Sequence, residues 1–315
     1  MCYVGMLHPY GTASRILQKL SAISVTPKQI ERVCTYYGSA LYKKQQEHGL
    51  QPFTTTLPQG RKSRVLYVLF DGSFINVRHN PKDKHIHKDE WKEVKLARLI
   101  DQQHIVKAIS KDRNYVSHSD YLAHIGNCDA FLEQLQLSID ARKFERLVFV
   151  CDGARWIWNW IEDAFAGATQ ILDYYHAVEH LNDCGKALFD QDASAATDWI
   201  NKCQQMLLSD KVDQIIKILR ELAATLPQKA KKDAALALHQ YYSENQTRMY
   251  YKTYRDQGLE IGSGAIESAN RFIIQQRAKL SGQRWKLTGA QAILTLRTFY
   301  YSNRWQELIE LIKNN

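Results

Sequence analysis

Apolar runs rich in β-forming residues alternate with helical patterns through the middle of the chain. Residues 65–70, 74–77 and 91–100 predict three early strands, and residues 147–151 predict a later one. The polar stretch 78–90 predicts a loop between the second and third of these strands. Short connections between the early strands favour an antiparallel meander.

Helical spacing of apolar residues marks the connections around the later strands. Residues 121–139 and 154–165 predict helices on either side of the strand at 147–151, and residues 167–176 predict a short strand that runs into a helix. The resulting order, β-β-β-α-β-α-β, is the one expected of a ribonuclease-H-like core, in which a strand reached through a helix can lie parallel to its neighbour. We therefore predict an α/β fold with a mixed sheet.

A long helical region interrupts this core. Residues 185–255 carry helical patterns with almost no strand signal, which predicts an all-helical insertion. The core is then made of residues 65–184 and 256–315. Two glycines break the chain before a helix that begins near Ala265.

The N-terminal region, residues 1–48, predicts a helical hairpin, with a linker at residues 49–64. Thr26 as N-cap and Pro27 at the first helical position start the second helix of the hairpin. Two helices across a short turn are also typical of a helix-turn-helix DNA-binding motif. The early turns of the second helix hold few basic residues, which favours a plain hairpin that packs on the next domain.

Composition is that of an ordinary globular protein. Of the 315 residues, 45% are hydrophobic and 24% are charged, and no apolar run approaches the ~20 residues of a membrane span. The first residues lack a basic segment followed by a long apolar core, so we do not expect a signal peptide. Six scattered cysteines without a CxxC pair predict reduced thiols in a cytosolic protein and no zinc knuckle.

Positive charge is concentrated near the C-terminus. The chain has a net charge of +9, and residues 246–315 hold 11 Lys and Arg against 5 Asp and Glu. A basic stretch favours a polyanionic partner, although an ordinary solvated surface explains the charge equally well.

Two of the predicted strands end in the same dipeptide. Asp71-Gly72 follows the first strand, and Asp152-Gly153 follows the strand at 147–151. The hydrogen-bond ladder holds the backbone of a strand end, and glycine lets the chain turn sharply beside the carboxylate. Carboxylates on neighbouring strands repel each other unless a cation lies between them, and Mg²⁺ prefers oxygen ligands.

A third carboxylate usually completes such a metal site. Glu267 is the candidate, because it lies in the first turns of the helix after the insertion, and Glu260 is its local competitor. A simpler interpretation exists for each element: Asp-Gly after a strand is most often a turn, and Glu267 alone favours the helix dipole. On these residues alone, a metal-dependent nuclease and the simpler interpretation both stay open.

Several segments resemble a known family. They read "VLFDGSF", "WKEVKLA", "VCDGARWIW", "GATQILDYYHAVEHL", "IGSGAIESAN" and "SGQRWKLTGAQAILTLR". In these segments, which extend in order over most of residues 65–300, the chain resembles the DDE transposases of bacterial insertion sequences, of the ISKra type. The stretch "ISVTPKQIERV" at 23–33 resembles the same family.

The resemblance implies that Asp71, Asp152 and Glu267 form a catalytic triad that holds Mg²⁺, for which Mn²⁺ can substitute. It also implies a helical insertion between the second and third of these residues. Family members usually carry a further N-terminal region that helps to bind the ends of the element. This chain starts almost at the helical hairpin, so we expect a truncated copy or an internal-start product, which puts full transposition activity in question.

The segment "DYYHAVEHL" places Asp173, His176 and His180 on one face of a helix. The family carries an aspartate-x-x-histidine signature here, so the resemblance implies that His176 is an active-site residue that contacts the scissile phosphate or positions a carboxylate. Residues 176–180 also match the H-x-x-E-H pattern of a zinc protease. A protease would leave both Asp-Gly pairs and the basic stretch unexplained. We interpret His180 as a packed helix residue.

The basic stretch near the C-terminus also contains an aromatic residue. Its cations would neutralise phosphates and make binding salt-dependent, and its tryptophan would stack on an exposed base at a nicked or flipped end. The alternative is a core tryptophan among solvated cations. The candidate DNA-binding residues are Arg271, Arg277, Lys279, Arg284, Trp285 and Lys286. After them, a core helix with Thr288 as N-cap is predicted.

The resemblance thus implies a DNA transposase that cleaves at insertion-sequence ends and transfers the strand by metal-dependent chemistry. Its partners would be double-stranded DNA, as terminal inverted repeats and as target, and further copies of itself in a homo-oligomer on paired ends, with no membrane. We expect a bacterial cytoplasmic location, with nucleoid association when DNA is bound. The alternatives are a catalytically idle DNA-binding transposase remnant and a zinc metalloprotease.

Overall fold

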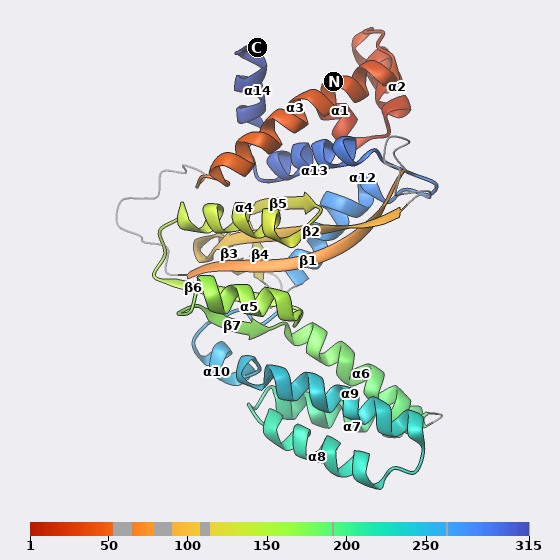
Figure 1. Cartoon of the computed structure of the whole chain (residues 1–315), viewed down its shortest axis with the longest axis vertical. Helices are drawn as coiled ribbons and strands as arrows, with labels where there is room; N and C mark the ends of the chain where they lie inside the picture. Colours follow the sequence, from red (N-terminus) through yellow and green to blue (C-terminus); the bar gives the residue numbers. More distant parts are fainter. Residues whose placement is uncertain (53–64, 79–89, 108–113, 191, 263, 315) are drawn as a thin grey trace. The chain divides into compact units, whose positions relative to one another are not determined.

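A computed structural model describes residues 1–52, 65–78, 90–107, 114–190, 192–262 and 264–314 of the chain (Figure 1). The chain divides into two compact units. Unit 1 contains Met1–Leu147 and Ala265–Asn315, and unit 2 contains Val148–Gly264. Residues 53–64 of the predicted linker lie outside the described residues.

Five strands form one mixed sheet in the order β5-β2-β1-β6-β7. The antiparallel strands are β1 (Val65–Val77), β2 (Glu90–Asp101) and β5 (Asp120–Ile125). The parallel pair is β6 (Arg146–Cys151) and β7 (Thr169–Leu172). A separate two-stranded sheet, β3 (Ile105–Lys107) and β4 (Asn114–Val116), follows the 3₁₀ turn η1 (Gln102–His104). The described residues therefore confirm the prediction of an α/β fold with a mixed sheet.

The elements of the main sheet follow the predicted order, β-β-β-α-β-α-β, but its first three strands are not the predicted segments, and the unpredicted β3 and β4 lie between β2 and β5. Residues 65–70 and 74–77 belong to one long strand, β1, rather than to two. Residues 121–139, predicted as one helix, divide into β5 and helix α4 (Cys128–Asp140). Every residue of β5 is buried, so the segment shows no alternation of apolar and polar residues that would identify it as a strand.

Three helices precede the sheet in unit 1: α1 (Cys2–Leu7), α2 (Tyr10–Ser21) and α3 (Pro27–His48). The predicted N-cap of α3 is confirmed. The Thr26 hydroxyl accepts a hydrogen bond from the Gln29 N–H (3.2 Å), and the Gln29 side chain accepts one from the Thr26 N–H (2.7 Å). Helices α2 and α3 are the predicted hairpin, and α3 packs on helix α13 (Leu287–Tyr301) (Figure 1).

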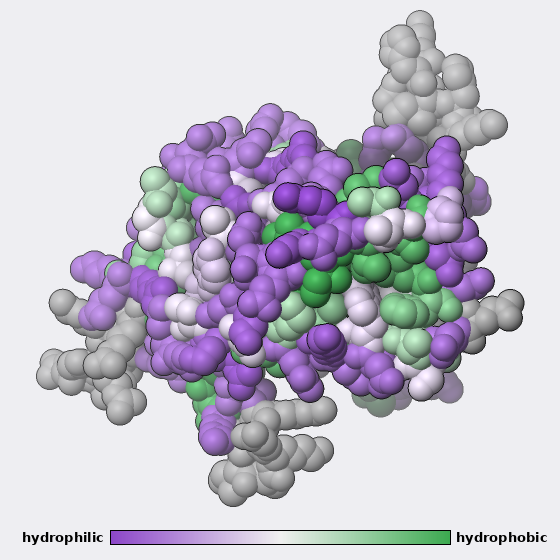
Figure 2. Space-filling model, turned by 90° about the horizontal axis from the view of Figure 1, so that it is seen from below, coloured by the Kyte–Doolittle hydropathy of each residue, from purple (hydrophilic) through white to green (hydrophobic). Residues whose placement is uncertain are grey.

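Unit 2 is helical apart from its strand residues. Its helices are α5 (Arg155–Ala164), α6 (Tyr174–Phe189), α7 (Ala193–Leu207), α8 (Val212–Thr225), α9 (Lys229–Asn245), η2 (Gln246–Arg248) and α10 (Tyr251–Asp256). The described residues within 185–255 contain helices and turns and no strand, as predicted for the insertion. Leu181, Cys203 and Leu219 belong to the buried stripes along which these helices pack. In the face seen in Figure 2, hydrophilic residues predominate and hydrophobic residues form smaller patches.

The chain returns to unit 1 through a series of helices. They are α11 (Gly264–Ala269), the π-helix η3 (Asn270–Gln275), α12 (Gln276–Ala278), α13 and α14 (Trp305–Lys313). Helix α13 is buried over most of its length, as predicted for a core helix, but its N-cap is Lys286 rather than Thr288. Among the described residues, no helix is long and apolar enough to cross a membrane.

Candidate active site

Asp71 lies inside a strand, not at the end of one. In β1, Asp71 pairs with Leu96 of β2, and Gly72 pairs with Lys95, so the antiparallel ladder continues through the dipeptide to Val77. The prediction of a sharp turn at Asp71-Gly72 is therefore wrong. The physical reason is that β2 provides a partner along both halves of β1, and a paired strand can hold an aspartate and a glycine that are poor strand formers by themselves.

The Asp71 carboxylate is held at both of its oxygens. Oδ1 accepts a hydrogen bond from the Gly72 N–H (2.7 Å), and Oδ2 accepts one from the side-chain amide of Asn270 (2.6 Å). Asn270 also donates to the Gly72 carbonyl oxygen (3.1 Å). These hydrogen bonds restrict the orientation of the carboxylate, and carboxylate oxygens are ligands that Mg²⁺ prefers.

Glu267 belongs to the same unit as Asp71. It lies in the first turn of α11 and is exposed, and it precedes Asn270 by three residues. Positions three apart lie on the same side of a helix. Asn270 contacts Asp71 and Gly72, so Glu267 lies within one helical turn of the residue that contacts the middle of β1. The competitor Glu260 belongs to the loop before α11, in unit 2.

Asp152 follows the last residue of β6 directly, as predicted. Gly153 has a φ of +99°, a backbone conformation that side chains rarely adopt. The Asp152 Oδ1 accepts a hydrogen bond from the Ala154 N–H (3.1 Å), just before α5 begins. The Tyr241 hydroxyl of α9 donates to the Asp152 carbonyl oxygen (2.8 Å). Helix α9 therefore contacts the backbone that carries this aspartate.

The histidine motif forms the start of α6, as predicted. Asp173 is the N-cap, and its carboxylate accepts a hydrogen bond from the Tyr175 N–H (3.1 Å). The Asp173 N–H donates to the Cys151 carbonyl oxygen (2.8 Å), which joins the motif to the residue before Asp152. His176 is the third residue of α6, with Nδ1 3.4 Å from the Glu179 carboxylate.

His180 packs against an aromatic ring, as we interpreted from the sequence. Its ring centroid is 4.1 Å from that of Tyr241 and 5.4 Å from that of His176. Burial, together with the neighbouring His176, lowers the pKa of His180. Burial also raises the pKa of the Tyr241 phenol, so this residue stays a hydrogen-bond donor at neutral pH. His180, Tyr241 and Asp152 thus form a chain of contacts inside unit 2.

The predicted catalytic residues are divided between the two units. Asp71 and Glu267 belong to unit 1, and Asp152 and His176 belong to unit 2. The meeting of the three carboxylates therefore stays a prediction. Among the described residues, no group of three or more His, Cys, Asp and Glu side chains is arranged to hold a metal ion.

Two of the six predicted DNA-binding residues are buried. Arg277 is 1% exposed; its Nε donates to the Gly5 carbonyl oxygen (3.1 Å), and its guanidinium lies over the rings of Trp285 (4.7 Å) and Tyr10 (5.1 Å). Trp285 is 5% exposed, and its indole N–H donates to the Ala278 carbonyl oxygen (3.1 Å). Neither side chain is placed to contact DNA, because both belong to the core that joins the N-terminal helices to α12. For Trp285 the alternative interpretation, a core tryptophan, fits the structure.

The other four cations, Arg271, Lys279, Arg284 and Lys286, are exposed. Two contacts connect them with β1. The Lys279 ammonium lies 3.3 Å from the hydroxyl of Ser73, two residues after Asp71. Arg78, just after β1, donates through its Nε to the Arg284 carbonyl oxygen (3.3 Å). Two residues of the group are therefore connected to the second half of the strand that carries Asp71.

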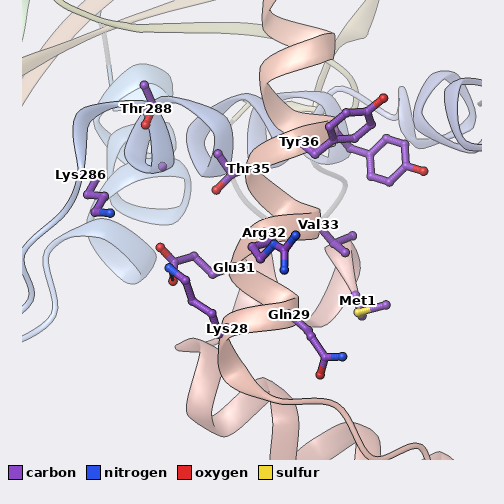
Figure 3. Close-up of a pocket in the computed structure, with 12 residues that line it drawn as sticks. Met1, Lys28, Gln29, Glu31, Arg32, Val33, Thr35, Tyr36, Lys286 and Thr288 are labelled. Carbon is purple, nitrogen blue, oxygen red and sulfur yellow. Dashed lines mark hydrogen bonds and ion pairs between the residues drawn. The ribbon is translucent and has the colours of Figure 1, made fainter.

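A groove in unit 1 has Lys286 in its wall. It has a volume of ≈ 770 Å³ and lies between α3 and the start of α13 (Figure 3). Lys28, Arg32 and Lys286 line it together with Glu31, which pairs with Lys28 at 2.8 Å. The exposed Tyr36 belongs to the same wall. The excess of cations suits an anionic partner.

Three residues of these environments were missed from the sequence: Asn270, Tyr241 and Arg98. An Asn in a helix and a Tyr in an insertion have no pattern that identifies them. Arg98 lies in a strand whose next residues are apolar, so a buried arginine there could have been noticed as an anomaly. Its guanidinium donates to the Ala265 carbonyl oxygen of α11.

Comparison with known families gives one match. The model of a family described as Uncharacterised protein family (UPF0236) matches residues 8–313, which is nearly the whole chain. The curated proteins contain no significant match. The comparisons therefore give relatives without an assigned activity.

Proposed function

We propose that this chain, which belongs to the uncharacterised protein family UPF0236, is a metal-dependent DNA transposase. The observation that carries the proposal is the environment of Asp71. A half-buried carboxylate in the middle of a sheet is held by two N–H donors, one of them Asn270, three residues after Glu267. Carboxylate oxygens are the ligands that Mg²⁺ prefers, and a carboxylate held in one orientation is suited to bind this ion.

A ribonuclease-H-like core is part of the proposal. Three antiparallel strands are followed by β6 and β7, each reached through a helix, and this order supports it. In such a core Asp152, at the end of β6, would complete the site with Asp71 and Glu267. Carboxylate oxygens are the donors that Mg²⁺ prefers, so the three residues fit this ion by their chemistry.

Each residue has a defined part in the proposed reaction. Asp71, Asp152 and Glu267 would hold Mg²⁺ or Mn²⁺, which when bound supplies the Lewis acidity for phosphodiester chemistry. His176 would contact the scissile phosphate or orient a carboxylate. Lys279 and Arg271 would neutralise the phosphates beside the cleaved bond. Water attack would free a 3′-hydroxyl at the element end, and this hydroxyl would then attack target DNA in line.

The proposed partners follow from this chemistry. They are double-stranded DNA with terminal inverted repeats, a target duplex, and other copies of the chain on paired ends. The exposed cations near the second half of β1 support a DNA partner.

A cleavage assay tests the proposal. The substrate is a DNA duplex that carries the sequences flanking the coding region, and products are resolved with Mg²⁺, with Mn²⁺ and with chelator. We expect metal-dependent nicking that Asp71→Asn, Asp152→Asn and Glu267→Gln each reduce by at least about 100-fold. Glu260→Gln is the matched control and should cleave as the wild type does.

Three results would contradict this assignment. Equal products from the wild type and Asp152→Asn would end the proposal of an enzyme, and DNA binding without cleavage would favour an idle remnant. Stoichiometric zinc that resists chelation, with loss on His176→Ala, would favour the protease.

A further inference from the structure

Asn270 lies where two kinds of helix meet. It is the first residue of the π-helix η3, directly after α11, and only 5% of its surface is exposed. Its side-chain amide donates to the Asp71 carboxylate at 2.6 Å and to the Gly72 carbonyl oxygen at 3.1 Å. A single NH₂ group therefore uses both of its hydrogens on adjacent residues of β1.

These two contacts fix which way the amide points. Both partners are acceptors, so the nitrogen and not the oxygen must face them. The Asn270 Oδ1 is then turned away from Asp71, buried and without a hydrogen-bond partner among the described residues. A buried oxygen without a partner costs free energy, so the two acceptors that the amide nitrogen contacts decide the orientation of the side chain. Holding Asp71 is the function that the geometry offers.

Two buried arginines hold the helices that carry Asn270. On the N-terminal side, Arg98 of β2 donates to the Ala265 carbonyl oxygen in the first turn of α11. On the C-terminal side, Arg297 of α13 donates through Nε to the Ile273 carbonyl oxygen (2.7 Å) and through a terminal nitrogen to the Phe272 carbonyl oxygen. A π-helix displaces carbonyl groups from their usual partners, and Arg297 contacts two carbonyls of this one.

The strand register places Arg98 beside Asp71. Arg98 pairs with Leu69 and Leu96 pairs with Asp71, so all four side chains belong to the same face of the antiparallel pair. Arg98 therefore holds the start of α11 on the face where Asn270 contacts Asp71. The segment that carries the amide is therefore held by Arg98 of β2 and by Arg297 of α13.

We propose that Asn270 is a positioning residue that fixes the Asp71 carboxylate in the orientation that binds the divalent metal. This inference rests on the proposed function, because it takes Asp71 as a metal ligand. Asn270 acts through Asp71 and need not touch the metal or the DNA. Without its amide, the carboxylate would lose a short hydrogen bond and rotate more freely, and metal binding would have to order it.

The test measures Mn²⁺ affinity by calorimetry and the Mn²⁺ dependence of DNA cleavage. Asn270→Ala removes the amide, and Asn270→Asp keeps its shape but replaces the donor by a second negative charge. Gln275→Ala, an exposed position in the same π-helix, is the matched control. Circular dichroism and the thermal midpoint show whether each variant folds. If Asn270→Ala does not fold, the Mn²⁺ affinity of Asn270→Asp is measured in its place.

We expect Asn270→Ala to raise the Mn²⁺ dissociation constant by roughly 10–100-fold, the usual effect of a residue that orients a metal ligand. Cleavage should return toward the wild-type rate at high Mn²⁺ concentration, which a general folding defect would not allow. In an Asp71→Asn background, Asn270→Ala should have little further effect on affinity. Gln275→Ala should bind Mn²⁺ like the wild type.

Two failures are distinguishable. If the wild type binds Mn²⁺ and cleaves DNA but folded Asn270→Ala does the same with unchanged affinity, the positioning role is wrong and the proposed function stands. If the wild type neither binds Mn²⁺ nor cleaves, the proposed function fails and the inference fails with it. An equal effect of Asn270→Ala with and without Asp71 would also overturn the inference.

Discussion

The dipeptide Asp-Gly occurs in two backbone settings that differ in what holds the aspartate. Asp71-Gly72 lies inside β1, paired with β2 on both sides of the dipeptide, and Asn270 holds the carboxylate. Asp152-Gly153 leaves β6 toward α5, and the Tyr241 hydroxyl contacts the Asp152 carbonyl oxygen. The Asp71 carboxylate is thus placed by the strand pairing and by a hydrogen bond from Asn270. The Asp152 carboxylate is placed by the change of chain direction after β6.

The glycines show the same difference. Gly153 has a φ of +99°, and a Cβ there would approach the Tyr241 ring and Leu172 at 3.0–3.1 Å. Gly72 lies in a regular strand, where the nearest atom that a Cβ would meet among the described residues is at the end of the Glu93 side chain, at 3.0 Å. The backbone conformation at position 153 requires glycine. At position 72 the conformation does not require it, and glycine there places no side chain next to Asp71. A shared dipeptide therefore does not imply a shared conformation.

The largest predicted effect is a pH dependence in the sheet that carries Asp71. His124 of β5 pairs with Lys95, which in turn pairs with Gly72. Burial, with the Lys95 charge beside it, lowers the pKa of His124 to about 4. The folded protein therefore holds a neutral His124. The stability that depends on this neutral form is present in full above pH 6.5, the ordinary pKa of histidine, and is lost as the pH falls toward 4.

We expect the free energy of unfolding to fall by on the order of 3 kcal/mol between pH 7 and pH 4 through this residue. Urea unfolding at a series of pH values measures the effect. His124→Gln should remove this part of the pH dependence, and His8→Gln, an exposed control, should keep it. An unchanged slope in His124→Gln would contradict the assignment.

The next effect separates the two glycines. Gly153→Ala places a Cβ in a strained backbone conformation against the Tyr241 ring, and we expect it to lower the free energy of unfolding by about 1–3 kcal/mol. Chemical denaturation measures the change. It should also displace Asp152, so the DNA cleavage rate should fall in protein that is still folded. Wild-type stability in Gly153→Ala would show that the turn after β6 does not depend on this glycine.

A smaller effect is expected for the contact that the insertion makes. Tyr241→Phe keeps the ring that packs on His180 but removes the hydrogen bond to the Asp152 carbonyl oxygen, at a cost of about 1 kcal/mol. Thermal unfolding gives the stability change, and the cleavage assay gives the effect on Asp152. Tyr242→Phe removes a hydroxyl bonded to the Ala177 carbonyl oxygen, away from Asp152, and should cost similar stability with no change in the cleavage rate.

The smallest effect is predicted for Gly72→Ala. The Glu93 side chain can move aside, and alanine is no worse than glycine in a strand, so we expect a stability change within about 0.5 kcal/mol of the wild type. Denaturation of Gly72→Ala beside Gly153→Ala gives the comparison directly. Similar losses in both variants would mean that the two settings are equivalent after all.

The sequence predicted the setting of Asp152 but not that of Asp71. An apolar strand followed by Asp-Gly is a local pattern, and it identifies the end of β6 correctly. Whether Asp-Gly ends a strand or lies within one depends on the partner strand, and β2 is more than a dozen residues away in sequence. β5 was missed for a related reason, since burial on both faces removes the alternation that identifies a strand.

The candidate site shows the same limit. The acidic residues next to glycines, Asp71 and Asp152, could be identified from the sequence, and so could the exposed cations. The burial of Arg277 could not, because it depends on contacts with Gly5 and Tyr10, some 270 residues earlier in the chain. For Trp285 the sequence left a core position and a DNA contact both open. The clamp by Asn270 depends in the same way on a contact between segments 199 residues apart.

Mn²⁺ binding to the Asp71 and Asp152 variants shows whether these two aspartates, placed by different means, hold the same metal site. If they do, Asp71→Asn and Asp152→Asn each weaken Mn²⁺ binding, and the double variant loses less than the sum of the two effects. Undiminished binding in either single variant, or strictly additive losses, would contradict a shared site.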